Sequence, residues 1–152
     1  CPLLMQLFMG YYGLAYLGIQ IDIFSAVVLV YTLYGGAYIA EIIRSGIESI
    51  PKGQWEAAKC IGLRPLDVLR DVILPQSFKI SLPALIGFHL GLIKDTSIAS
   101  IIGYSELLRE GKTIMNVTGY PFETYILVAV IYFIICYPLS KYVGWTERKA
   151  GL

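Results

Sequence analysis

Charged residues are scarce in this chain of 152 residues. They make up 15% of the sequence, whereas a typical soluble domain has about 25%. Hydrophobic residues make up 57%, so the chain has too little polar surface to cover a globule of this size in water. The composition therefore excludes an ordinary soluble domain and predicts a protein surrounded by lipid.

Three further scarcities exclude whole classes of function. Lys and Arg total 12 against 11 Asp and Glu, so the chain lacks the basic surplus that binds nucleic acid phosphates. Cys1, Cys60 and Cys136 are widely spaced and form no CxxC pair, which argues against a zinc site, a redox motif or a disulfide framework. His89 is the single histidine, and no GxSxG or HExxH motif is present. We therefore expect no enzyme activity, no metal and no cofactor in this chain.

Long apolar runs divide the chain into membrane spans and connecting segments. A helix needs about 20 apolar residues to cross the hydrocarbon core, and short loops rich in Lys and Arg stay on the cytoplasmic side. The expected order is an outer-face or re-entrant connector at 1–22, a membrane helix at 23–43, a cytoplasmic loop at 44–79, a membrane helix at 80–104, an outer loop at 105–123, a membrane helix at 124–143 and a cytoplasmic tail at 144–152.

The cytoplasmic loop carries punctuation that predicts structure of its own. A short helix is expected at 52–61, followed by Gly62 in the left-handed conformation that ends many helices. Pro65 suits the first turn of a second helix, and Pro75 is expected to end it. Such a helix-turn-helix is either a solvated cap over the membrane bundle or a docking surface for a cytoplasmic partner.

One set of residues in this loop resembles a known motif. Glu56-Ala57-Ala58, then Gly62, then Val72-Ile73-Leu74-Pro75 closely resembles the EAA loop of binding-protein-dependent ABC transporter permeases, with Val72 in the place of the usual Ile. The runs AYIAEIIRSGIESIPKGQWEAA at 37–58, LIKDTSIAS at 92–100 and PFETYILV at 121–128 are similar to permeases for polar amino acids. The resemblance extends over nearly the whole chain.

This resemblance implies an all-α fold, a polytopic membrane helical bundle like that of type I ABC importer permeases, with a cytoplasmic helix-turn-helix coupling loop. Family members typically have five membrane helices, so the chain is expected to be N-terminally truncated and to begin after the second. The implied function is translocation of polar amino acids by ATPase-driven alternating access. The implied location is the bacterial plasma (inner) membrane, with a multi-pass topology and a cytoplasmic C-terminus.

The resemblance also implies the partners. They are a cytoplasmic ABC ATPase dimer, an extracytoplasmic amino-acid-binding protein, a second permease subunit that is identical or related, and membrane lipid, with no nucleic acid. ATP hydrolysis is expected on the separate ATPase chain.

Gly111-Lys112-Thr113 resembles the end of a phosphate-binding loop, but Glu106 occupies the position of its first Gly, so no nucleotide site is expected in this chain. The residues expected to couple the permease to the ATPase are Glu56, Ala57, Ala58, Gly62, Leu63, Leu74 and Pro75.

Charges inside the spans are the second group of candidates. Lys94 and Asp95 lie well within an apolar run, where each charge costs about 2.5–3.5 kcal/mol on insertion scales. With Thr96 and Ser97 they either line a pathway or gate for a zwitterionic substrate or form structural ion pairs between helices. Neighbours in a helix point about 100° apart, so Lys94 and Asp95 are not expected to pair with each other.

Glu41 and Arg44 lie three residues apart near the cytoplasmic end of their span. Residues at this spacing share a helical face, so a salt bridge that orders the entry to the loop is expected.

Two other function classes stay open from the sequence. One is an ABC permease for another small solute or an exporter, and the other is a passive membrane channel or scaffold subunit that requires neither ATP nor a binding protein.

Overall fold

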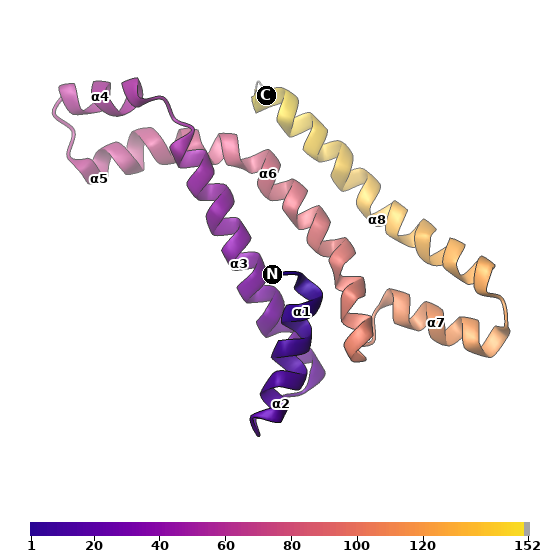
Figure 1. Cartoon of the computed structure of the whole chain (residues 1–152). Coiled ribbons are helices and arrows are strands. Elements are labelled where there is room, and N and C mark those ends of the chain that lie inside the picture. The colour runs from indigo at the N-terminus through magenta and orange to yellow at the C-terminus, as the bar shows by residue number, and fades with distance from the viewer. Residues whose placement is uncertain (151–152) are drawn as a thin grey trace. The chain divides into compact units, whose positions relative to one another are not determined.

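The computed structural model describes the backbone of residues 1–150 and the side chains of residues 1–144. The last two residues of the tail expected at 144–152, and its side chains after Gly144, lie outside the described residues. Within residues 1–150 the chain consists of helices and short turns without a strand, which confirms the all-α fold class (Figure 1). The elements are α1 (Leu3–Phe8), η1 (Met9–Gly13), α2 (Leu14–Tyr16), α3 (Ile23–Glu48), α4 (Lys52–Cys60), α5 (Pro65–Asp67), η2 (Val68–Ile73), α6 (Leu74–Asp95), η3 (Thr96–Ile102), α7 (Leu107–Thr118) and α8 (Pro121–Ala150).

Three helical segments are long and apolar enough to cross a membrane. They are Ile23–Glu48, Pro65–Ile102 and Pro121–Gly144. Each contains most of one span expected from the sequence. Each helical segment extends beyond its expected span at one end or at both. The side of the membrane on which each end lies stays a prediction.

The chain divides into two compact units, which we describe separately. The first unit contains residues 1–36 and 89–140. Its core joins Leu3 and Leu7 of α1 to Val30 of α3 and Ile102 of η3. The helical segment that begins at Leu3 and ends at Tyr16 therefore packs on α3, and Gly18, with φ +83°, follows it.

The second unit contains residues 37–88 and the C-terminal part of α8. Its core consists of Ile50, Ala58, Val68 and Ile73, so α4 packs against η2 across a tight turn. We call residues 52–73, which comprise α4, the turn, α5 and η2, the hairpin. The two arms of the hairpin lie beside each other in Figure 1.

Two expected loops are largely helical. Pro75 does not end the second helix of the hairpin, because it is the second residue of α6 and the helix continues through it. The preceding turns, Val68–Ile73, form a wide π-helix, which loosens the helix where the proline ring would otherwise clash with a carbonyl of the preceding turn. The expected outer loop at 105–123 contains the 12-residue helix α7, which ends at Gly119 with φ +74°.

Candidate functional site

The turn of the hairpin has the geometry that its sequence predicts. Gly62 adopts φ +81°, and the N–H groups of Gly62 and Leu63 donate to the carbonyls of Lys59 and Ala58 at 2.9 and 3.3 Å. Pro65 is the first residue of α5, where its missing N–H is not needed. This confirms the predicted reversal, which brings the two arms of the hairpin together.

The hairpin buries only part of the EAA motif. Ala58 is 4% exposed and packs in the core, with Leu63 half-buried beside it. Glu56 and Ala57 are exposed, and Glu56 forms no ion pair with the described side chains. The motif thus divides into residues that hold the hairpin together and residues that face outward. Leu74 and Pro75, at the start of α6, are also exposed.

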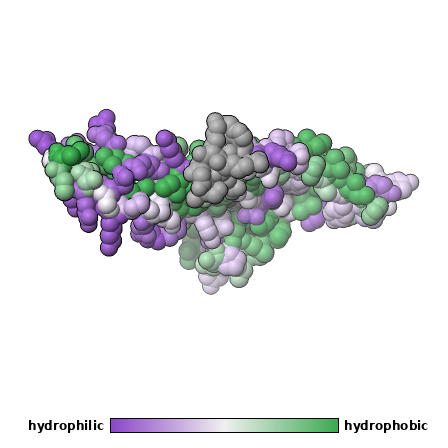
Figure 2. Space-filling view, turned by 90° about the horizontal axis from the view of Figure 1, so that it is seen from above, coloured by the Kyte–Doolittle hydropathy of each residue, from purple (hydrophilic) through white to green (hydrophobic). Residues whose placement is uncertain are grey.

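Apolar side chains flank the turn on the outside of the hairpin. Ile61 is 77% exposed and Leu66 is 76% exposed. Exposed charged residues lie close to them in the sequence, among them Lys59 in α4 and Arg64 in the turn. Figure 2 shows hydrophilic side chains beside an apolar patch at the end of the molecule that carries α4 and α5. An apolar patch rimmed by polar residues is typical of protein interaction sites.

The predicted ion pair near the end of α3 is present and has a third member. The Arg44 guanidinium donates from Nε to Glu41 at 3.0 Å and from Nη1 to Glu48 at 2.7 Å, and its Nη2 also contacts Glu41. These side chains are more than half exposed, so the triad adds little stability in water. Its role in orienting the loop stays a prediction. Glu48 could have been included from the sequence, because it lies four residues after Arg44 on the same helical face.

The helical segment that carries Lys94 and Asp95 changes from α-helix to 3-10 helix at these residues, and we call this change the break. α6 ends at Asp95, and Thr96 begins the tighter 3-10 segment η3. The hydroxyls of Thr96 and Ser97 donate to the carbonyls of Ile93 and Lys94 at 2.7 and 2.8 Å. Lys94 is exposed and Asp95 is half-buried, and neither forms an ion pair with the side chains that the structure describes.

Hydroxyl groups that sequence reasoning missed surround this break. The Tyr31 hydroxyl of α3 donates to the carbonyl of Asp95 at 2.5 Å. The Tyr132 hydroxyl of α8 donates to Glu106 Oε2 at 3.2 Å, and Glu106 caps α7 by accepting from two backbone N–H groups. Tyrosine is common in membrane spans, so nothing in the sequence distinguished Tyr31 or Tyr132. Glu106 was recognisable only by its place before an amphipathic helix.

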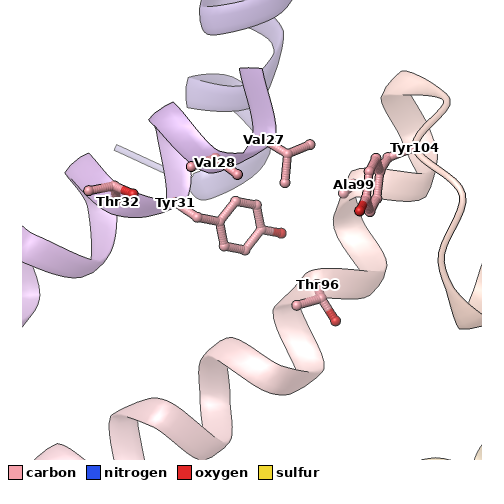
Figure 3. A pocket seen from close by; sticks show the side chains of 7 residues that line it. All are labelled: Val27, Val28, Tyr31, Thr32, Thr96, Ala99 and Tyr104. Atoms are coloured by element: carbon pink, nitrogen blue, oxygen red, sulfur yellow. The ribbon is translucent and has the colours of Figure 1, made fainter. Parts of the chain in front are cut away.

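An open cavity of about 410 Å³ lies beside the break. Figure 3 shows the ring of Tyr31 pointing from α3 toward the segment that carries Thr96. Thr96 is the one residue of the four predicted pathway residues among those that line this cavity. Cavities of about 300–1,000 Å³ are the usual size for small-molecule sites. The lining residues are Val27, Val28, Tyr31, Thr32, Thr96, Ala99 and Tyr104.

One carboxylate outside the spans has a perturbed pKa. Asp22 precedes α3 and accepts hydrogen bonds from the hydroxyl and the N–H of Ser25 at 2.6 and 3.0 Å. These bonds favour the charged form, the hydroxyl bond most, and so lower the pKa of Asp22. The carboxylate therefore caps the first span with a fixed negative charge.

Known proteins resemble the chain over nearly its whole length. Residues 1–150 match the family of binding-protein-dependent transport system inner membrane components. The probable amino-acid ABC transporter permease protein YckA of Bacillus subtilis (strain 168) is 42% identical over 148 residues, which cover 97% of this chain and 66% of that protein. The L-cystine transport system permease protein TcyB of the same organism is 43% identical over 149 residues, which cover 97% of this chain and 64% of that protein.

A solved structure has the same fold. A chain in the crystal structure of an amino acid ABC transporter with histidines superposes with a TM-score of 0.91 at 40% identity, covering 98% of this chain and 70% of that chain. The chain spans about two thirds of the length of the curated relatives named above. With its three apolar helices, it is a multi-pass membrane protein. The chain belongs to the family of binding-protein-dependent transport system inner membrane components.

Proposed function

We propose that this chain is part of the permease subunit of an ABC importer that translocates polar amino acids. The observation that carries the proposal is the family match over residues 1–150, together with a hairpin that presents Glu56 and Ala57 outward around a left-handed Gly62. Relatives named for amino acids and L-cystine support the substrate class. The chain performs no covalent chemistry, and ATP hydrolysis belongs to a separate chain.

The hairpin is the proposed contact with the ATPase. Glu56 offers an unpaired anion to a cation on that partner, and the exposed Ile61 and Leu66 add apolar area beside it. Closure of the ATPase dimer displaces the hairpin and, with it, the membrane helices. This assignment places the hairpin and the C-terminus on the cytoplasmic side of the bacterial inner membrane.

Residues at the break in the third helical segment are the proposed substrate pathway. Lys94 and Asp95 carry charges complementary to the two ends of a zwitterion, and Thr96 lines a cavity of suitable size. The hydroxyls of Thr96 and Tyr31 donate to backbone carbonyls, and the oxygen of Tyr31 keeps lone pairs that can accept from a substrate ammonium group. The segment from Ser105 to Phe122, which contains α7, forms the proposed surface for the binding protein on the outer side.

The experiment that tests the proposal measures transport by the full-length subunit. It is reconstituted in proteoliposomes with its ATPase, its binding protein and the second permease subunit, and uptake of a panel of labelled amino acids is followed with and without ATP. Selective uptake that requires ATP and the binding protein supports the proposal. Flux without ATP would favour a passive channel, and no uptake of any amino acid in the panel would count against this substrate class.

Substitutions separate the two proposed sites. Glu56→Lys or Gly62→Trp is expected to uncouple ATP hydrolysis from uptake while membrane insertion stays intact. Asp95→Leu is expected to impair uptake without loss of assembly. If the complex dissociates instead, Asp95 holds the structure together and does not line the pathway.

A further inference from the structure

Two helices of the second unit touch at a point that has no room for a side chain. Gly46 of α3 is buried against α6. A Cβ atom at this position would collide with Oγ of Ser81 and would lie 3.0 Å from the carbonyl oxygen of Ser77. Real Cβ atoms rarely approach backbone oxygen this closely. Only glycine therefore fits at position 46 with the present spacing of α3 and α6.

Serine hydroxyls complete the contact from the other side. Ser77 is 2% exposed and Ser81 is 3% exposed, so each hydroxyl needs a partner within the protein. The Ser81 hydroxyl donates across the contact to the carbonyl of Ile42 at 3.3 Å, whereas the Ser77 hydroxyl donates within α6 to Leu74 at 3.1 Å. Ser81 therefore both fills the space above Gly46 and bonds to the helix that carries it.

This contact lies directly beside the base of the hairpin. Ile47 follows Gly46 in α3 and packs on the hairpin core, and Ile80 precedes Ser81 in α6 and packs on the same core. The end of α3, the hairpin and the start of α6 are thus packed in one unit. A displacement of the hairpin would therefore act on both helices next to the contact of Gly46 with Ser81.

We propose that Gly46 and Ser81 are positioning residues for coupling, which fix the spacing of α3 and α6 so that the hairpin moves both helices together. This inference rests on the proposed function of the hairpin. It assigns to the pair no contact with substrate or with the ATPase. Its role is to keep the two helices at one separation while force passes between them.

The test introduces a methyl group into the contact. Gly46→Ala in the full-length transporter with its partners is expected to leave assembly and ATP hydrolysis in place and to lower uptake per ATP hydrolysed about tenfold, because an overpacked contact forces the helices apart. Gly36→Ala is the matched control, since it lies in the same helix and its Cβ would meet nothing within 4 Å. It is expected to leave uptake per ATP unchanged.

A second substitution tests whether the contact itself is responsible. Ser81→Gly combined with Gly46→Ala removes the Oγ and Cβ atoms of the serine that the new methyl group would meet, while the Ser77 carbonyl stays in place, so part of the coupling should return. If Gly46→Ala acted only by destabilising the protein, the double variant should be less well coupled than the single one, because glycine inside a helix costs stability. Uptake per ATP that stays at the wild-type level in Gly46→Ala would overturn the inference, as would a double variant no better coupled than the single one.

Ser81→Ala covers the case in which Gly46→Ala fails to assemble. It adds no atom and removes only the hydroxyl that bonds to Ile42, and we expect it to assemble and to lose part of the coupling. Unchanged coupling in this variant would overturn the inference. If the wild-type complex itself shows no ATP-dependent uptake, the proposed function fails. If the wild type is coupled and the variants are equally well coupled, only the inference about Gly46 and Ser81 fails.

Discussion

The packing of the hairpin core predicts how firmly α4 is held. Ile73 of η2 is fully buried and contacts a core that includes Ala58 of α4. Ile73→Ala removes three carbon atoms from this core. At about 0.8 kcal/mol for each buried CH₂ group, the loss is about 2.4 kcal/mol, and incomplete collapse of the cavity raises it into the range of about 2–5 kcal/mol for such substitutions.

Hydrogen exchange of the α4 amides measures this loss directly. Since about 1.4 kcal/mol corresponds to a tenfold change in an equilibrium, a loss of about 2.4 kcal/mol should raise the open population of α4 about 50-fold. Exchange of amides in residues 52–60 should accelerate by that factor in the full-length protein in lipid nanodiscs. Leu66→Ala is the matched control, because its side chain is 76% exposed and its loss leaves the core intact.

The reasoning fails if the two variants give the same exchange rates in α4. Equal and slow exchange would mean that α4 is held by contacts other than this core. Equal and fast exchange would mean that Leu66 is buried against α4 in the protein in lipid. An acceleration spread evenly over α3 and α8 would indicate a general loss of stability and would not be evidence for a local core.

Three other contacts give predictions of their own. The pKa of Asp22 is lowered by Ser25, so the stability that this cap adds is present above the ordinary carboxyl pKa and is lost as the pH falls through the lowered value; Asp22→Asn should abolish this acid dependence in circular dichroism. Glu106→Ala removes the cap of α7 and should cost about 1 kcal/mol, visible as faster hydrogen exchange in its first turn. Tyr31→Phe removes the donor to the Asp95 carbonyl and should cost about 1 kcal/mol in a thermal or denaturant unfolding assay.

Features that depend on residues close together in the sequence were predicted correctly. The left-handed Gly62 and the placement of Pro65 were predicted from single residues, because backbone conformation at a helix end depends on the residue itself and its neighbours. The pair of Glu41 and Arg44 was predicted because helical spacing fixes which residues share a face. In each case the partners lie within a few residues of one another.

Contacts between helices were not predictable in this way. Tyr31 and Asp95 are 64 residues apart, and Ser81 and Ile42 are 39 apart. Periodicity places a residue on a face of its own helix but does not say which helix covers that face. The sequence therefore could not distinguish Gly46 from the other glycines in and near the spans, most of which have no neighbour at the position of a Cβ atom.

The one clear error concerns Pro75 and bears on the mechanism. A proline in a helical pattern normally marks its end, but the π-helix at Val68–Ile73 allows the chain to continue. The second arm of the hairpin is thus the start of the apolar helical segment Pro65–Ile102. No loop separates the proposed ATPase contact from the span that carries Lys94 and Asp95. In the proposed mechanism, a displacement of the hairpin would therefore enter this span along a continuous helix, and it would act on α3 through Ile47, which packs on the hairpin core, and through the contact of Gly46 with Ser81.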